Sequence, residues 1–186
     1  MKHPSNQQFF AYWDAKRAGA RAPDRSEIEP EAVRELLPDI FVLSCDAAAR
    51  FPFRVAGTRL CALLGRDLKD RSFSELFTGD GRREIEDIIT VVTEEMLAAV
   101  AGITAVSENG TPAHLELLLL PFSHRVHAPL SLTGLLAPFD NGGGGLRDFK
   151  LTSWRYLGHP PPERLVPRAL RKLRVARGLM VYEGLR

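Results

Sequence analysis

The sequence predicts an α+β domain built on an antiparallel sheet, and three observations lead to this fold class. Two short segments rich in β-branched and aromatic residues follow each other at residues 40–46 and 51–57. Helical periodicity then dominates residues 58–101. Strand-like alternation returns after that, with Asn109-Gly110 as the strongest short hairpin signal. Five strands joined mostly by short turns are therefore expected to form one antiparallel sheet, with helices covering one face.

Composition and length exclude several other classes of protein. The chain has 186 residues, 45% of them hydrophobic, and its 25 Lys+Arg against 23 Asp+Glu give a net charge of +2. Two cysteines are too few for a disulfide framework, and no apolar run approaches the roughly 20 residues that span a bilayer. The N-terminus also lacks the apolar core of a signal peptide. A cytoplasmic globular protein is expected, rather than a disordered, membrane-spanning, collagen-like or secreted disulfide-rich one.

The first segment, residues 6–17, is expected to form a short helix that carries four aromatic side chains, with a connector completing residues 1–30. Such an apolar surface must be covered, and two alternatives stay open. The helix docks on its own domain, or it covers a partner's surface in a dimer or a complex. The aromatic residues of this expected interface are Phe9, Phe10, Tyr12 and Trp13.

The body of the domain is expected to run from residue 31 to residue 157, and a tail follows from 158 to 186. Helices are predicted at residues 30–37, 58–64, 72–77 and 80–101. In the last of them, apolar residues recur every three or four positions, and the final two are Met96 and Val100. Strands are predicted at 103–108, 113–124 and 130–139, and residues 149–157 either add a strand or lie across the body. If the junction at Gly57 requires an unusual backbone conformation, Gly57→Val should unfold the domain.

One stretch carries a family resemblance. The residues VAGTRLCALLGRDLKDRSFSELF, at 55–77, resemble the "aGT-x-L…L-GR-x-L-x-x-x-S-F-x-x-L" pattern found across PAS sensors. Residues 13–46 resemble the opening of small, single-domain PAS proteins of alphaproteobacterial type, and the whole resemblance spans about residues 6–157. It implies a PAS-like five-stranded sheet, with a small cavity between the sheet and the short helices. It also implies a sensory module that often dimerises through an N-terminal helix and acts by binding another protein.

The inner sheet face and the helices above it supply the residues of this expected ligand pocket. An apolar lining is equally what a plain hydrophobic core requires, so both interpretations remain open. Arg59, Cys61 and Ser44 are the polar groups that would distinguish a pocket from a core. The predicted lining is Phe53, Val55, Arg59, Leu60, Cys61, Leu64, Phe73, Phe77, Ile88, Val92, Leu117, Leu119 and Leu132.

Residue chemistry argues against the cofactors found in this family and against catalysis. Haem needs an axial ligand, yet residues 58–101 contain no histidine. The photoreactive flavin branch carries an Asn-Cys-Arg-Phe motif, and the neighbours of Cys61 differ from it. The pair His124 and His127 has no cysteine or carboxylate cluster beside it, so no metal site is expected. No nucleophile elbow or catalytic carboxylate pair is present, the cofactor stays unassigned, and the protein is not expected to be an enzyme.

The C-terminal segment is strongly basic. Residues 155–186 contain eight Lys and Arg against two Glu, a net charge of +6. Since the whole chain has a net charge of +2, residues 1–154 have a net charge of −4. Helical spacing predicts a basic amphipathic helix there, which either docks by its leucines or contacts an acidic partner, nucleic acid or an anionic membrane. We expect a non-enzymatic sensory or adaptor module in bacterial signalling; the alternative is a nucleic-acid-binding or membrane-associated accessory protein. The basic residues of the tail are Arg168, Arg171, Lys172 and Arg174.

Overall fold

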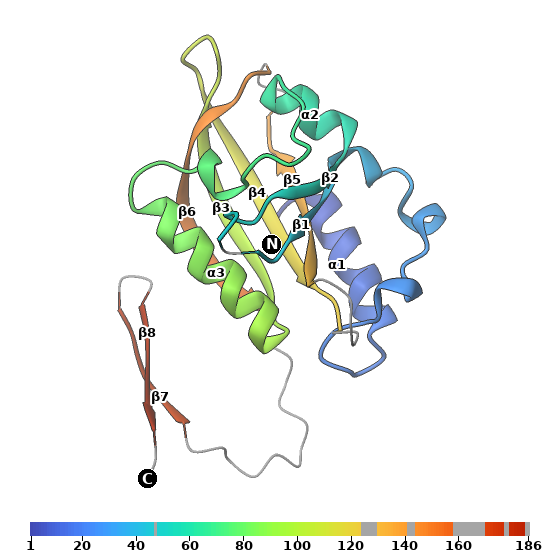
Figure 1. Ribbon diagram of the computed structural model, residues 1–186, viewed down its shortest axis with the longest axis vertical. Helices are drawn as coiled ribbons and strands as arrows, with labels where there is room; N and C mark the ends of the chain where they lie inside the picture. The colour runs from blue at the N-terminus through green and yellow to red at the C-terminus, as the bar shows by residue number, and fades with distance from the viewer. Residues whose placement is uncertain (47, 124–129, 141–143, 158–169, 177–178, 185–186) are drawn as a thin grey trace.

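A six-stranded antiparallel sheet forms the centre of the protein, in the order β2-β1-β5-β4-β3-β6 (Figure 1). The computed structural model describes residues 1–46, 48–123, 130–140 and 144–157, together with the backbone of 170–176 and 179–184. The α+β fold class is confirmed, and residues 149–157 belong to a sixth strand that pairs with β3. The strands are β1 (Ile40–Ser44), β2 (Phe53–Ala56), β3 (Ala98–Val106), β4 (Pro112–Pro121), β5 (Ser131–Pro138) and β6 (Arg147–Leu157).

Helices cover both faces of this sheet (Figure 1). The inner face carries α2 (Thr58–Leu64), the 3-10 turn η4 (Ser74–Leu76) and α3 (Gly81–Glu95). On the outer face, α1 (Pro4–Lys16) packs against β4 and β5. The chain between α1 and β1 adds the 3-10 turns η1 (Arg25–Glu27), η2 (Pro30–Val33) and η3 (Leu37–Asp39). Within the described residues, no helix is long and apolar enough to cross a bilayer.

The aromatic face of α1 docks on the protein's own sheet. Phe9 and Trp13 are buried in the outer cluster, and the Trp13 indole Nε1 donates a 2.9 Å hydrogen bond to the Pro121 carbonyl. Phe10 and Tyr12 are half-buried at the margin of the same cluster. Of the two alternatives, docking on the protein's own domain therefore holds for Phe9 and Trp13. Neither side chain is accessible to a partner.

A buried carboxylate fixes the start of α1. Glu116 on β4 is 5% exposed and accepts hydrogen bonds from the backbone N–H groups of Lys2 (2.6 Å) and His3 (2.9 Å). The amide Nδ2 of the buried Asn6 donates to the Glu116 side chain (3.1 Å) and to its backbone carbonyl (3.0 Å). Since a buried charge is costly unless hydrogen bonds satisfy it, these donors tie the N-terminal segment to the middle of the sheet.

The long helix ends earlier than the sequence suggests. It stops at Glu95, and Met96 adopts a left-handed conformation with φ 55°, which terminates the helix before β3 begins at Ala98. The prediction that Val100 lies on this helix is wrong. Val100 pairs with Leu118 and Arg155 in the sheet, and the small or β-branched residues around it suit a strand that is flanked on both sides.

Two further helix predictions are wrong. Residues 30–37 form 3-10 turns rather than one helix, with a second proline inside η3. In the tail, the backbone forms an antiparallel pair, β7 (Leu170–Ala176) and β8 (Leu179–Gly184). Short apolar runs fit the periodicity of a helix as well as that of a strand. The β-branched and aromatic residues here, such as Val175, Val181 and Tyr182, favour strands. Arg168, His124 and His127 lie outside the described residues.

Gly57 marks a close approach of two backbone segments. Its φ of −67° is ordinary for any residue, so the junction between β2 and α2 needs no special backbone conformation. A Cβ at this position would lie 2.2 Å from the Pro38 carbonyl oxygen and 2.4 Å from that of Leu37. Glycine is required here because η3 passes directly against the start of α2.

Candidate functional site

The candidate site lies between the inner face of the sheet and the layer formed by α2, η4 and α3. A row of five phenylalanine rings runs through this layer from β1 and β2 to β6. Phe41 and Phe53 contact each other at 5.6 Å between ring centroids, and Phe73 stacks on Phe41 at 5.3 Å. Phe77 continues the row at 5.6 Å from Phe73 and reaches Phe149 at 5.9 Å. The rings meet mostly edge to face, the geometry that aromatic pairs favour.

Glycine makes room for the first ring of this row. Gly134 on β5 lies directly opposite Phe41 on β1 in the register of the sheet. A Cβ on Gly134 would come within 2.2 Å of the Phe41 ring, so the ring covers the bare backbone of the neighbouring strand. The aromatic row is therefore seated on the sheet itself and not only on the helices.

Most of the predicted lining residues meet in one buried cluster. Phe53, Phe73 and Phe77 belong to the aromatic row, and helices and strands supply the aliphatic side chains around it. Cys61 is half-buried at the margin of the cluster. The predicted aliphatic lining residues in this cluster are Leu60, Leu64, Ile88, Val92, Leu117, Leu119 and Leu132.

The placement of Val55 in this lining is wrong, because β2 contains a bulge. Val42 pairs with Val55 but Leu43 pairs with Phe53, so β2 holds one extra residue, Arg54, between the two pairs. An extra residue reverses the side-chain alternation along a strand. Phe53 therefore points into the inner cluster, whereas Val55 is 55% exposed.

The placement of Arg59 in the lining is wrong as well. It occupies the solvent side of α2, where its guanidinium forms an ion pair with Asp39 on η3 and donates to the Glu35 carbonyl (3.0 Å). Leu60 and Leu64, four residues apart, take the inward side of this helix. The hydrogen bond with Asp39 raises the pKa of Arg59. Arg59 thus joins α2 to η3 at the surface and does not reach the interior.

Sequence reasoning missed Phe41 and Phe149, although each carried a signal. Phe41 and Leu43 alternate along β1 and face inward together. Phe149 is the first large apolar residue of β6, and its backbone forms an isolated bridge with Phe77. What the sequence could not show is that these two rings, 108 positions apart, complete the same row.

The chemistry of this layer is apolar. The buried polar residues of the described part of the chain are Asn6, Ser74, Ser107, Glu116 and Thr133, and the charged one, Glu116, lies on the outer face beside α1. Burial raises the pKa of the Cys45 thiol to about 11, so this thiol stays protonated and weakly nucleophilic at neutral pH. The buried side chains of this layer are the phenylalanine row and the aliphatic residues packed around it.

One comparison with known proteins assigns a family. A family model described as PAS domain matches residues 1–137, which is more than half of the chain. No curated protein sequence matches the chain.

Among solved structures, the chain is similar to the PAS domain of an HTR-like protein from Haloarcula marismortui. That match has a TM-score of 0.43 and 17% identity, and it covers 59% of this chain and 90% of that one. A LOV protein of Rhodobacter sphaeroides matches with a TM-score of 0.45 and 15% identity, over 74% of this chain and 69% of that one. From the match to the family over residues 1–137, we conclude that this chain belongs to the PAS domain family.

Proposed function

We propose that the protein is a non-enzymatic sensory or regulatory module of bacterial signal transduction, working in the cytoplasm. Its input is a small ligand held in the inner layer, and its output is contact with a protein partner or a second copy of the chain. The aromatic row between the sheet and the short helices is the observation that carries this proposal. A ligand that displaces these rings must also move the elements that carry them, which links binding to a change of shape.

The lining indicates the chemical class of the ligand. Apolar pockets with few polar groups bind molecules that are themselves largely apolar. The aromatic row joins β1, β2, the segment around η4 and β6, so a planar or aliphatic molecule among the rings contacts all four. Differential affinity for two arrangements of these rings then supplies the free energy for signalling.

Native mass spectrometry of the protein purified from cells tests this function. We expect a mass excess in the native spectrum that disappears when the same sample is denatured. Leu132→Phe, which enlarges a buried inner side chain, should reduce the adduct, because added volume competes with the ligand for the same space. Leu118→Phe is the matched control, since Leu118 is equally buried but belongs to the outer cluster. A bare protein mass in both spectra would contradict a ligand as the input.

The charge of the tail supports a second candidate function, in nucleic-acid binding. The segment 155–186 carries a net +6, and Arg171, Lys172 and Arg174 lie together on β7 of a two-stranded ribbon. If this ribbon binds phosphates, the triple substitution of these three residues by glutamine should weaken binding to duplex DNA and flatten its dependence on salt. Fluorescence anisotropy at several salt concentrations measures both effects. Binding that is equally salt-dependent in the wild type and the variant would contradict this role.

A further inference from the structure

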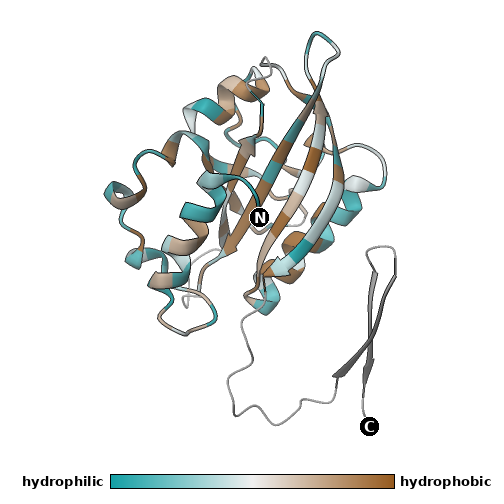
Figure 2. Ribbon diagram, turned by 180° about the vertical axis from the view of Figure 1, so that it is seen from behind, coloured by the Kyte–Doolittle hydropathy of each residue, from teal (hydrophilic) through white to brown (hydrophobic). Residues whose placement is uncertain are grey.

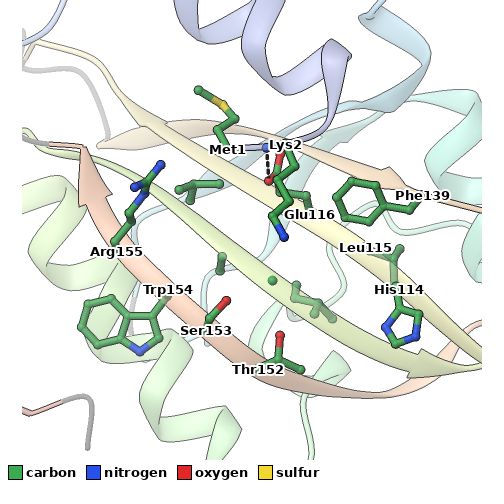
Figure 3. Close-up of a pocket in the computed structure, with 14 residues that line it drawn as sticks. Met1, Lys2, His114, Leu115, Glu116, Phe139, Thr152, Ser153, Trp154 and Arg155 are labelled. Atoms are coloured by element: carbon green, nitrogen blue, oxygen red, sulfur yellow. Dashed lines mark hydrogen bonds between the residues drawn. The ribbon is translucent and has the colours of Figure 1, made fainter. Parts of the chain in front are cut away.

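A hollow of about 310 Å³ opens on the outer face of the sheet, away from the aromatic row (Figure 3). It lies over β3, β4 and β6, beside the N-terminal segment that precedes α1. On the outer face α1 contacts β4 and β5, and no helix of the described residues covers the half formed by β3 and β6 (Figure 2). The side chains that give the hollow its chemistry are Lys2, His114, Phe139, Thr152, Ser153 and Arg155.

A bulge in β6 builds the floor of the hollow. Gly102 on β3 pairs with Ser153, while Ile103 pairs with Leu151, so Thr152 is the extra residue of β6. A bulge of this kind allows two successive side chains to leave the same face of the sheet. The hydroxyl groups of Thr152 and Ser153 lie 2.8 and 3.0 Å from the position that a Cβ on Gly102 would occupy. Glycine at this position therefore leaves space for both hydroxyls above the strand.

Two cationic side chains and one imidazole lie around these hydroxyls. Arg155 lies at one end of the hollow and His114 at the other, and Lys2 reaches over β4 from the N-terminal segment (Figure 3). Among the described residues, no hydrogen bond or ion pair engages the side chains of Lys2, Arg155, Thr152 or Ser153. These groups are available to an incoming ligand as donors.

Glu116, the one carboxylate among the described residues that line the hollow, is already engaged. Glu116 accepts the backbone N–H groups of Lys2 and His3 and the amide of Asn6, so its oxygens face donors from the protein's own N-terminal segment. These neutral donors leave Glu116 its charge, so Lys2, Arg155 and Glu116 together give the hollow a net +1, and two cationic side chains and two hydroxyl groups remain to contact a ligand of opposite charge. Phe139, which is 46% exposed, provides an apolar wall beside them.

We propose that this hollow binds a small organic anion through a carboxylate or phosphate head group. Arg155 and Lys2 contact the charge, Thr152 and Ser153 donate hydrogen bonds to the same head group, and the remainder of the molecule packs against Phe139. The volume is at the lower end of the range of small-molecule sites, which suits a metabolite-sized ligand. This site is independent of the aromatic row and of the function proposed for it.

Amide NMR spectra of the whole chain, titrated with inorganic phosphate and separately with succinate, test the proposal. Sodium chloride at equal ionic strength is the control for screening. We expect saturable shifts at Gly102, Thr152, Ser153 and Arg155 with at least one of the two anions. Saturation with phosphate alone assigns a phosphate head group, and saturation with succinate alone assigns a carboxylate.

Two variants identify the groups that bind. Arg155→Gln should weaken the affinity about tenfold, as expected for the loss of a charged hydrogen bond. Thr152→Val keeps a β-branched side chain on the strand and removes only the hydroxyl, so it should weaken binding while the thermal unfolding curve stays the same. Lys150→Gln is the matched control, because Lys150 is an exposed cation of the same strand that does not line the hollow.

Three results would overturn the site. The first is the absence of saturable shifts with either anion. The second is an equal loss of affinity in Lys150→Gln and Arg155→Gln, which would show that only the general charge of the surface matters. The third is a doubled mass in light scattering that accompanies the shifts, which would assign this face to a contact between two copies of the chain.

Discussion

Replacing Gly57 by alanine is expected to lower the free energy of unfolding by at least about 3 kcal/mol, toward the upper end of overpacking costs. The new Cβ would lie 2.2 and 2.4 Å from the carbonyl oxygens of Pro38 and Leu37, and both of these are backbone atoms. A side chain in the way can rotate to another conformer, but a carbonyl moves only with its whole segment. The substitution must therefore push η3 away from α2, and it should also weaken the ion pair between Arg59 and Asp39. Urea unfolding followed by circular dichroism measures the loss.

Gly81→Ala is the control for this experiment. Gly81 is the first residue of α3, and a Cβ there would meet no atom within 4 Å. Alanine at this position should leave stability unchanged or raise it by about 0.5 kcal/mol, because it reduces the entropy of the unfolded chain. Equal unfolding midpoints for the two variants would contradict the close approach at Gly57.

Trp13→Ala is expected to cost about 3–5 kcal/mol of stability, the usual range for removing a buried tryptophan. The side chain is completely buried against the outer face of the sheet, and its indole donates to Pro121. Truncation leaves both a cavity and an unsatisfied carbonyl beneath α1. Thermal unfolding measures the loss, and Phe10→Ala is the control, since Phe10 is only half-buried and should cost much less.

Light scattering on Trp13→Ala separates this role from that of an interface residue. If Trp13 holds α1 on its own domain, the variant keeps the molecular mass of the wild type while it melts at a lower temperature. A halved mass with an unchanged melting temperature would instead show that the aromatic face of α1 joins two copies of the chain.

The sequence was sufficient for the order of the strands β1 to β5 and of the helices α1, α2 and α3, and for part of the inner cluster. Alternation in β4 and helical spacing in α3 placed Leu117, Leu119, Ile88 and Val92 correctly, because each pattern follows the period of its own element. Docking of α1 was predicted only as one of two alternatives. An amphipathic pattern shows that a face must be covered, but it does not identify the surface that covers it.

The errors arise where pairing with another strand changes the local pattern. Bulges in β2 and β6 reverse the alternation, which exposed Val55 and brought Thr152 and Ser153 together over Gly102. The position of a bulge depends on how a strand pairs with its neighbours. It therefore cannot be predicted from the sequence of that strand alone. Likewise, α3 ends because Met96 adopts a left-handed conformation. Glycine or asparagine usually occupies such a position, so a methionine there does not predict a helix end.

The contact between α1 and Glu116 also bears on how the chain is made. Asn6 and Glu116 are 110 positions apart, and Trp13 is 108 positions from its acceptor Pro121. At the usual speed of a ribosome, α1 leaves the exit tunnel about 5–20 s before β4 leaves it. During that interval, Phe9 and Trp13 have no sheet to cover them, so α1 reaches its native place only after β4 and β5 are available. Nascent chains of this protein therefore expose the aromatic face of α1 until β4 and β5 have emerged to cover it.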